Sequence, residues 1–280
     1  MKTGEAESVA AAAARMVTEA DTRLTCRHVI QAVSETCGES RRTVRAVISG
    51  LVEAGVLRFA QDCGTCFLEK NYSGCVALSP HVTVAPPRVP VTPEHGCAVV
   101  RLMPGVSFGD CRHPTTRLSV RALDFFLTER PKDGPPCVSG LDIGTGSGIL
   151  ALVAVRLGVE RVTAIDIDPC ARKEAVDNVA LNGCSDCIEV SGRELEQVEG
   201  PFSLVMANLR LPTLKRYAPR IDNLMAPRGG LVVSGIRTEE TEALSRVYGE
   251  LGTKVWQTSD GGWAAMVFIK NGPENRVFRI

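Results

Sequence analysis

A glycine-rich turn is the first place where residue types and spacing could support chemistry. Gly144, Gly146 and Gly148 follow the apolar stretch Leu141–Ile143, where a buried strand would turn into a helix. Glycine lets the backbone turn tightly and approach a ligand, and amide hydrogens at a helix N-terminus can bind an anion. Nicotinamide-binding turns have glycines at the first, third and sixth positions, whereas the third glycine here is at the fifth. The turn predicts an anion-binding site and weakens the case for a dehydrogenase. A glycine-rich turn without ligand stays open.

A carboxylate follows the next predicted strand. The apolar segment 162–165 ends at Asp166, about twenty residues beyond the glycines. At that spacing a carboxylate can accept hydrogen bonds from two ribose hydroxyls at the end of a neighbouring strand. Asp168 precedes Pro169, a pair typical of a helix start, so we expect it to cap a helix. Asp166 is therefore the predicted ribose-binding residue.

An asparagine follows a third predicted strand. Asn208 comes directly after Phe202–Ala207, and the carboxyl ends of parallel strands meet at one edge of a sheet. Its amide oxygen could accept a hydrogen bond from an amine nucleophile, although asparagines in turns are commonly structural. His113 could serve as a base because its pKa suits proton transfer, but its place before Pro114 in a loop favours a structural or lid role.

The chain has 11 cysteines. Cys63, Cys66 and Cys75, with Cys37, could supply thiolates to zinc or an iron–sulfur cluster. Their spacing is irregular, and we expect no metal. The odd count and the absence of an export signal predict reduced thiols in a cytoplasmic protein.

Alternating strand-like and helix-like segments must position these residues. Such alternation after Gly96 predicts an α/β fold with a Rossmann-like parallel sheet flanked by helices. The segments are Val138–Ile143, Leu150–Leu157, Val162–Ile167, Ala171–Leu181, Phe202–Ala207 and Gly230–Ser234.

The pattern of residues 1–78 differs from the alternation of strands and helices after Gly96. It contains three helical stretches, followed by two strand-like segments around a glycine turn, which together predict a winged helix. We expect domains at 1–78 and 97–280, joined by a proline-rich extended linker at 79–96. The helical stretches are Glu5–Glu19, Thr25–Thr36, with Asp21-Thr22 as a cap, and Arg41–Gly55; the strands are Val56–Ala60 and Cys66–Glu69.

Charge excludes bulk electrostatic recruitment of a partner. The 280 residues carry 32 Lys and Arg against 32 Asp and Glu, so no net field attracts nucleic acid or anionic lipid. No membrane segment is expected. Arg41, Arg42 and Arg45 begin the third N-terminal helix, where winged helices contact nucleic acid, yet residues 1–75 have no net positive charge. Homodimer formation or docking of a protein substrate is an equal alternative for this domain.

From about Val100 to Lys270 the sequence resembles the PrmA-type ribosomal protein methyltransferases. The resemblance lies in segments 104–109 and 113–117, the turn 141–150, the acidic motif 165–169, and segments 207–209 and 231–236. It implies a class I methyltransferase fold, a seven-stranded, mostly parallel sheet with a reversed last strand near Ala264–Lys270. It also implies S-adenosylmethionine as cofactor and catalytic roles for Asn208 and Thr116. The implied cofactor contacts are Phe108, Gly109, Thr116, Asp142, Gly144, Thr145, Gly146, Gly148, Ile149, Asp166, Ile167 and Asn208.

Two departures from the family pattern matter. Asp110-Cys111-Arg112 alter the loop after Phe108-Gly109, and the winged helix replaces the family's N-terminal substrate domain. Enzymes that methylate planar amide nitrogens have two prolines and an aromatic residue after the asparagine, whereas Leu209-Arg210-Leu211 follow here. We therefore expect an aliphatic amine of a protein as methyl acceptor. The alternatives are an RNA or DNA methyltransferase guided by the winged helix, and a non-catalytic regulator that senses S-adenosylmethionine.

Overall fold

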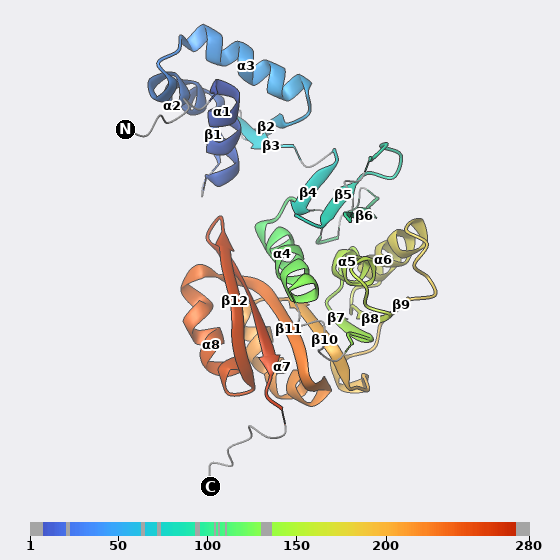
Figure 1. Cartoon of the computed structure of the whole chain (residues 1–280). Coiled ribbons are helices and arrows are strands. Elements are labelled where there is room, and N and C mark those ends of the chain that lie inside the picture. Colours follow the sequence, from blue (N-terminus) through green and yellow to red (C-terminus); the bar gives the residue numbers. More distant parts are fainter. Residues whose placement is uncertain are drawn as a thin grey trace. The chain divides into compact units, whose positions relative to one another are not determined.

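The computed structural model of the chain contains two compact units, Met1–Gly74 and Cys75–Ile280 (Figure 1). The structure describes residues 8–20, 23–62, 65–71, 74–92, 96–103, 105, 107–109, 111–129 and 136–272. No helix among these residues is both long and apolar enough to cross a membrane.

The first unit has the three helices and the hairpin predicted from the sequence. Ser8, Thr25 and Ser40 each accept a hydrogen bond from the first turn of a helix, so side-chain caps fix where the three helices begin. Thr25 caps the second helix, and the expected cap Asp21-Thr22 lies outside the described residues. Apolar residues from all three helices and the sheet, among them Val33 and Ile48, form one core. The elements are α1 (Val9–Glu19), β1 (Leu24–Thr25), α2 (Cys26–Cys37), α3 (Arg41–Glu53), β2 (Leu57–Asp62) and β3 (Thr65–Lys70), with antiparallel strand order β1-β3-β2.

The predicted linker at 79–96 is wrong. The strands β4 (Val76–Ser79), β5 (Val82–Ala85) and β6 (Ala98–Arg101) form a small sheet inside the second unit, and the boundary between units lies at Gly74. Alternate residues of β4 and β5 are buried, so this segment folds on its apolar face. Pro80 lies in the turn after β4, and Pro86, Pro87 and Pro90 lie in the connection after β5, where a missing N–H costs no ladder hydrogen bond.

The second unit is built on a seven-stranded sheet with strand order β12-β13-β11-β10-β7-β8-β9. The expected parallel core is confirmed, because β11, β10, β7, β8 and β9 pair in parallel. The expected reversed strand is β13, which runs antiparallel to both β11 and β12. The strands are β7 (Ser139–Ile143), β8 (Arg161–Ile165), β9 (Ile188–Ser191), β10 (Phe202–Asn208), β11 (Met225–Arg237), β12 (Gly252–Asp260) and β13 (Trp263–Lys270).

Helices cover both faces of this sheet (Figure 1). On one face, Leu214 and Ile221 of α7 and Leu244 of α8 pack against alternate apolar residues of the central strands. On the other face, α4 contacts α5, and Phe126 of α4 fills the space beside Gly230. The helices are α4 (Pro114–Thr128), α5 (Ile149–Arg156), α6 (Pro169–Leu181), α7 (Leu211–Leu224) and α8 (Thr241–Gly249), with short 3-10 turns η1 (Leu195–Gln197) and η2 (Thr238–Glu240).

Candidate functional site

A cleft of about 910 Å³ opens at the carboxyl ends of the parallel strands. Ligands of open α/β sheets bind at this edge because the loops that follow neighbouring strands diverge there. Six residues that the sequence predicted to contact a cofactor line the cleft: Phe108, Gly144, Gly146, Asp166, Ile167 and Asn208. The rest of the lining comes from Ser107, Ile143, Ile165, Asp168, Ala171, Arg193–Glu196, Leu209, Thr213, Arg216 and Tyr217.

The glycine turn after β7 requires glycine for two reasons. Gly146 has a φ of 57°, a left-handed conformation that side chains rarely adopt, and a Cβ there would lie 2.4 Å from the Phe108 carbonyl oxygen. The same carbonyl accepts the Ser147 amide hydrogen at 2.9 Å. The turn and the Phe108 loop are thus in direct backbone contact, and any side chain at Gly146 would separate them.

The amide hydrogens of the turn are not free for an anion, which corrects the sequence prediction. Those of Gly144 and Thr145 both donate to the Ile165 carbonyl, at 2.9 and 3.0 Å. That of Gly146 donates to Asp166 Oδ2 at 2.9 Å. The sequence cannot show this, because the acceptors lie on the neighbouring strand and the loop after it. An anionic group in this cleft must therefore find its donors elsewhere.

Asp166 has a fixed orientation at the cleft. Its Oδ2 accepts the Gly146 amide hydrogen, and its Oδ1 accepts the Asp168 amide hydrogen at 3.0 Å. Each carboxylate oxygen has a second lone pair, so each can still accept a hydrogen bond from a hydroxyl. Asp168 accepts the Cys170 amide hydrogen at 2.8 Å and caps α6, as predicted.

Asp142 lies beneath the turn and does not line the cleft. It is fully buried, and its Oδ2 accepts a hydrogen bond of 2.7 Å from the Thr145 hydroxyl. Burial, with a smaller contribution from the nearby charge of Asp166, raises the pKa of Asp142 to about 7 despite that hydrogen bond. The other predicted contact residues that do not line the cleft are Gly109, Thr116, Thr145, Gly148 and Ile149.

Asn208 ends β10, lines the cleft and has an unpaired acceptor. Its Oδ1 is buried and has no hydrogen-bond partner among the described residues. A buried amide oxygen without a partner is costly, and in a cleft it is a ready acceptor for an incoming N–H. Thr116, the other predicted catalytic residue, is 1% exposed with its Oγ1 also unpaired, but it lies in α4 and outside the cleft lining.

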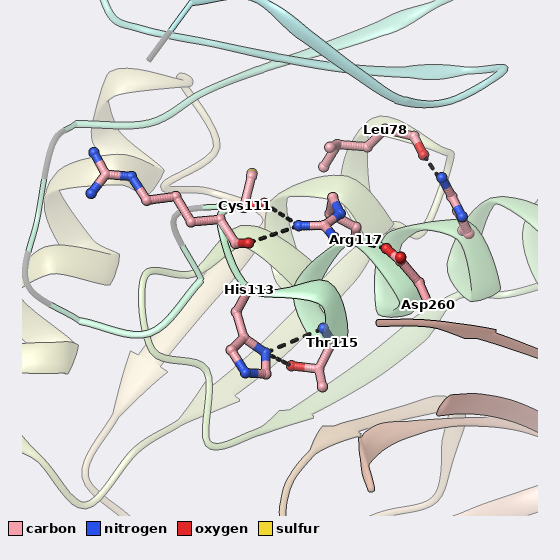
Figure 2. Close-up of polar contacts among 8 residues, drawn as sticks. Leu78, Cys111, His113, Thr115, Arg117 and Asp260 are labelled. Atoms are coloured by element: carbon pink, nitrogen blue, oxygen red, sulfur yellow. Dashed lines mark hydrogen bonds and ion pairs between the residues drawn. The ribbon is translucent and has the colours of Figure 1, made fainter. Parts of the chain in front are cut away.

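His113 caps α4 and supports the loop beside the cleft. Its Nδ1 accepts the Thr115 amide hydrogen at 3.3 Å and lies 2.8 Å from the Thr115 hydroxyl (Figure 2). Its ring packs between Phe108 and Trp263, with centroid distances of 5.1 and 4.8 Å. The structure thus agrees with the structural role expected for His113 and offers it no place in the cleft lining.

Sequence reasoning missed Arg117, which holds the altered loop. Its guanidinium donates to the carbonyls of Arg112 and Cys111, at 2.7 and 3.3 Å, and pairs with Asp260 at 2.7 Å (Figure 2). Cys111 adopts a φ of 69°, uncommon for a residue with a side chain, and this contact stabilises it. No local signal could reveal the pair, because Asp260 lies 143 residues further along the chain.

Two polar residues of α6 and the asparagine that caps its C-terminus, also missed, anchor the segment before the loop. Glu174 Oε2 accepts the Ser107 amide hydrogen at 3.0 Å, and Asn178 Oδ1 accepts that of Met103 at 2.8 Å. The Asn182 side chain accepts the Arg101 amide hydrogen through Oδ1 and donates to the Arg101 carbonyl through Nδ2. The three occur every fourth residue, along one face of α6 and its C-terminal cap, and this spacing is visible in the sequence.

The cysteines form no metal site that the structure describes. No group of three or more His, Cys, Asp or Glu side chains in the described part of the chain could hold a metal ion. Cys66 and Cys75 are exposed thiols, whereas Cys63 lies outside the described residues.

Comparisons with known proteins agree with the resemblance read from the motifs. The family model of the ribosomal protein L11 methyltransferase (PrmA) matches residues 69–271. The chain is 37% identical over 202 residues to a ribosomal protein L11 methyltransferase of Geotalea daltonii, covering 70% of this chain and 64% of that protein. It is 43% identical over 153 residues to that of Trichlorobacter lovleyi, covering 55% and 50%.

A solved structure points the same way. The crystal structure of a ribosomal protein L11 methylase from Lactobacillus delbrueckii subsp. bulgaricus matches with a TM-score of 0.61 and 29% identity, covering 71% of this chain and 99% of that one. The chain spans 64% of the length of the Geotalea daltonii relative, and the family match begins at residue 69, so the first unit stands almost entirely outside it. From residue 69 to residue 271, the chain belongs to the PrmA family of ribosomal protein L11 methyltransferases.

Proposed function

We propose that this protein is an S-adenosylmethionine-dependent methyltransferase that methylates an amine of a protein substrate, a ribosomal protein similar to L11. One observation carries the proposal: the glycine turn, the oriented Asp166 carboxylate and the unpaired Asn208 oxygen border one cleft. The relatives, which are ribosomal protein L11 methyltransferases, supply the substrate class. A ribosomal protein as acceptor would place the reaction in the cytoplasm.

The residues of the cleft fit S-adenosylmethionine. Asp166 can accept hydrogen bonds from ribose hydroxyls through both oxygens, and the Ile167 side chain, 80% exposed, offers an apolar surface for the adenine. Gly144 and Gly146 line the cleft with backbone alone, so no side chain of the turn blocks a ligand there. When bound, the cofactor supplies an electrophilic methyl group on a sulfonium.

Asn208 would orient the nucleophile. Its Oδ1 can accept a hydrogen bond from a neutral amine and hold the nitrogen lone pair toward the methyl group. Phe108 and Leu209 line the same cleft with apolar surface and would exclude water around the amine. Positioning and desolvation of this kind require no general base, in agreement with the capping role of His113.

The winged-helix assignment of the first unit stays a proposal. Its element order and its three-stranded antiparallel sheet support it. We propose that this unit recognises a partner in place of the substrate domain typical of the family. Association of two copies through it is the competing proposal.

Label transfer tests the proposed activity. The full-length protein is incubated with cell extract and S-adenosylmethionine labelled in the methyl group, and the product is digested with protease or nuclease. Release of label by protease alone is the expected result. Release by nuclease alone would make the protein a nucleic-acid methyltransferase, and binding without transfer to any acceptor would make it a regulator.

Replacing Asp166 should weaken cofactor binding. Asp166→Ala removes the acceptor of two ribose hydroxyls, and charge-assisted hydrogen bonds are worth about 1.5–3 kcal/mol, so the loss should be roughly tenfold or more. Calorimetry with S-adenosylmethionine and its demethylated product measures it. Asp186→Ala, which removes an exposed carboxylate outside the cleft lining, is the matched control and should change nothing. Equal affinity of the folded Asp166 variant and the wild type would refute the assignment.

Replacing Asn208 should slow transfer more than it weakens cofactor binding. Asn208→Ala removes the acceptor that orients the amine, and we expect a barrier higher by about 2 kcal/mol, roughly a thirtyfold slower single turnover. Asn208→Asp keeps an acceptor oxygen at the same position and should lose less. Losses of equal size in transfer and cofactor affinity would recast Asn208 as a cofactor ligand, and no loss in either would make it a turn residue.

A further inference from the structure

One face of α3 is exposed while the opposite face packs in the core of the first unit. Val44 and Ile48 are buried, whereas Arg42, Ala46 and Ser49 are exposed. Three of the exposed residues on this side are small: Ala46, Ser49 and Gly50. The proposed methyltransferase function uses none of them.

Nothing in the fold of the first unit requires glycine at position 50. It lies in the interior of α3, where glycine weakens a helix relative to alanine. No heavy atom lies within 4 Å of the position a Cβ would take, so packing of the chain itself does not require glycine. A face without long side chains instead allows an external partner to approach the helix backbone closely.

Three arginines without an ion-pair partner among the described residues lie beside this face of small residues, which we call the smooth face of α3. Arg41, Arg42 and Arg45 are exposed and form no ion pair or hydrogen bond with any residue that the structure describes. The contrast within the unit is clear, since Arg23 and Arg58 both pair with Glu69 at 2.8 Å. The first five residues of α3 carry three positive charges and no negative one.

A fourth arginine of the first unit is also unpaired. Arg27, the second residue of α2, is exposed and forms no ion pair or hydrogen bond with any residue that the structure describes.

We propose that α3 docks in the major groove of duplex DNA, with Arg41, Arg42 and Arg45 on the phosphates that border it. The major groove of B-form DNA is about 12 Å wide and admits an α-helix, and a smooth face of Ala46, Ser49 and Gly50 suits close approach to base edges. The deep, narrow major groove of A-form RNA does not admit a helix. Because the chain has no net charge, the attraction is local and involves few phosphates.

Fluorescence anisotropy of the full-length protein with a labelled DNA duplex tests this. We expect a dissociation constant of about 1–100 μM near physiological salt. Three phosphate contacts give a salt slope of about −2.7, so affinity should fall roughly 40-fold between 50 and 200 mM salt. Replacing Arg41, Arg42 and Arg45 together by Gln should weaken binding at least about tenfold. The matched control, Arg161→Gln with Lys173→Gln and Arg246→Gln, removes as many exposed charges from the second unit and should change affinity less than about twofold.

Gly50→Gln separates groove insertion from simple charge attraction. The open space around Gly50 lets the variant fold, and its unfolding temperature should not decrease. Its longer side chain should nevertheless weaken DNA binding about fivefold or more, because close approach is lost. Unchanged binding by Gly50→Gln, equal losses in the charge control, or binding of duplex RNA as tight as that of DNA would overturn the proposal.

A second copy of the chain is the competing occupant. Glu53 ends the exposed face of α3, so two antiparallel copies could pair Glu53 of each with Arg42 of the other. Light scattering of the DNA-free protein decides this point. A dimer that Gly50→Gln dissociates would overturn the proposal, whereas a monomer is the expected result. None of these measurements depends on methyl transfer, so their failure leaves the proposed function untouched.

Discussion

Deleting residues 1–74 should leave the second unit folded and able to bind S-adenosylmethionine, whereas deleting residues 1–80 should destabilise it by about 3–6 kcal/mol. The difference is β4, where Val76 and Leu78 are 6% and 4% exposed, and each buried aliphatic side chain contributes about 1.5–3 kcal/mol. The Leu78 carbonyl also accepts a hydrogen bond from Arg121 at 3.3 Å. Urea unfolding of the two truncated proteins measures the difference.

The same pair of proteins tests the role of the first unit. The protein lacking residues 1–74 should bind the cofactor like the full-length chain, yet lose activity on the natural acceptor. Full activity would show that the first unit does not recognise the substrate. Equal stability of the two truncated proteins would contradict the inclusion of β4 in the second unit.

Replacing Asp142 should change how stability depends on pH. The folded protein raises the pKa of Asp142 from 3.8 to about 7, so between these values the folded state binds a proton that the unfolded chain has released. This contribution to stability is present at pH 4 and below and is lost as the pH rises toward 7 and beyond. Asp142→Asn cannot ionise and keeps an acceptor for the Thr145 hydroxyl.

The free energy of unfolding of Asp142→Asn, relative to wild type, should therefore rise by roughly 2–4 kcal/mol between pH 4 and pH 8, since one pKa unit corresponds to about 1.4 kcal/mol. Urea unfolding across that range gives the two profiles. Parallel profiles would mean that Asp142 is ionised in the folded protein throughout. Thr145→Val, which removes the hydroxyl donor and keeps the carboxyl, is the control and should retain the pH dependence.

Local patterns predicted the parts of the site that lie on single elements. Apolar runs predicted β7, β8 and β10, and Asp166, directly after β8, and Asn208, the last residue of β10, both line the cleft. The reason is geometric: in a parallel sheet, the position after a strand is fixed once the strand is known.

Partners far apart in the sequence were not predictable in this way. The contact of Arg117 with Asp260 depends on the hairpin between β12 and β13 returning to α4. The acceptor that occupies the Gly146 amide is likewise visible only after β7 and β8 have paired. The linker prediction failed for another reason: the alternation of Val76, Leu78, Val82 and Val84 forms two strands with a buried face, and the prolines fall outside those strands.

The anchoring of Arg101 by Asn182 has a consequence for the chemical ageing of the protein. An asparagine followed by glycine is prone to deamidation, because the glycine nitrogen can attack the side-chain carbonyl. Here Asn182 is buried with its amide held by Arg101, and the Gly183 amide donates to the Ala180 carbonyl at 3.0 Å. Stored folded, the protein should keep this amide, whereas incubation in urea should convert it to a carboxylate, detectable as a mass gain at this peptide. Because an aspartate there would set a carboxylate oxygen against the Arg101 carbonyl, a chain that has once aged while unfolded would refold with the strand before the cleft poorly held.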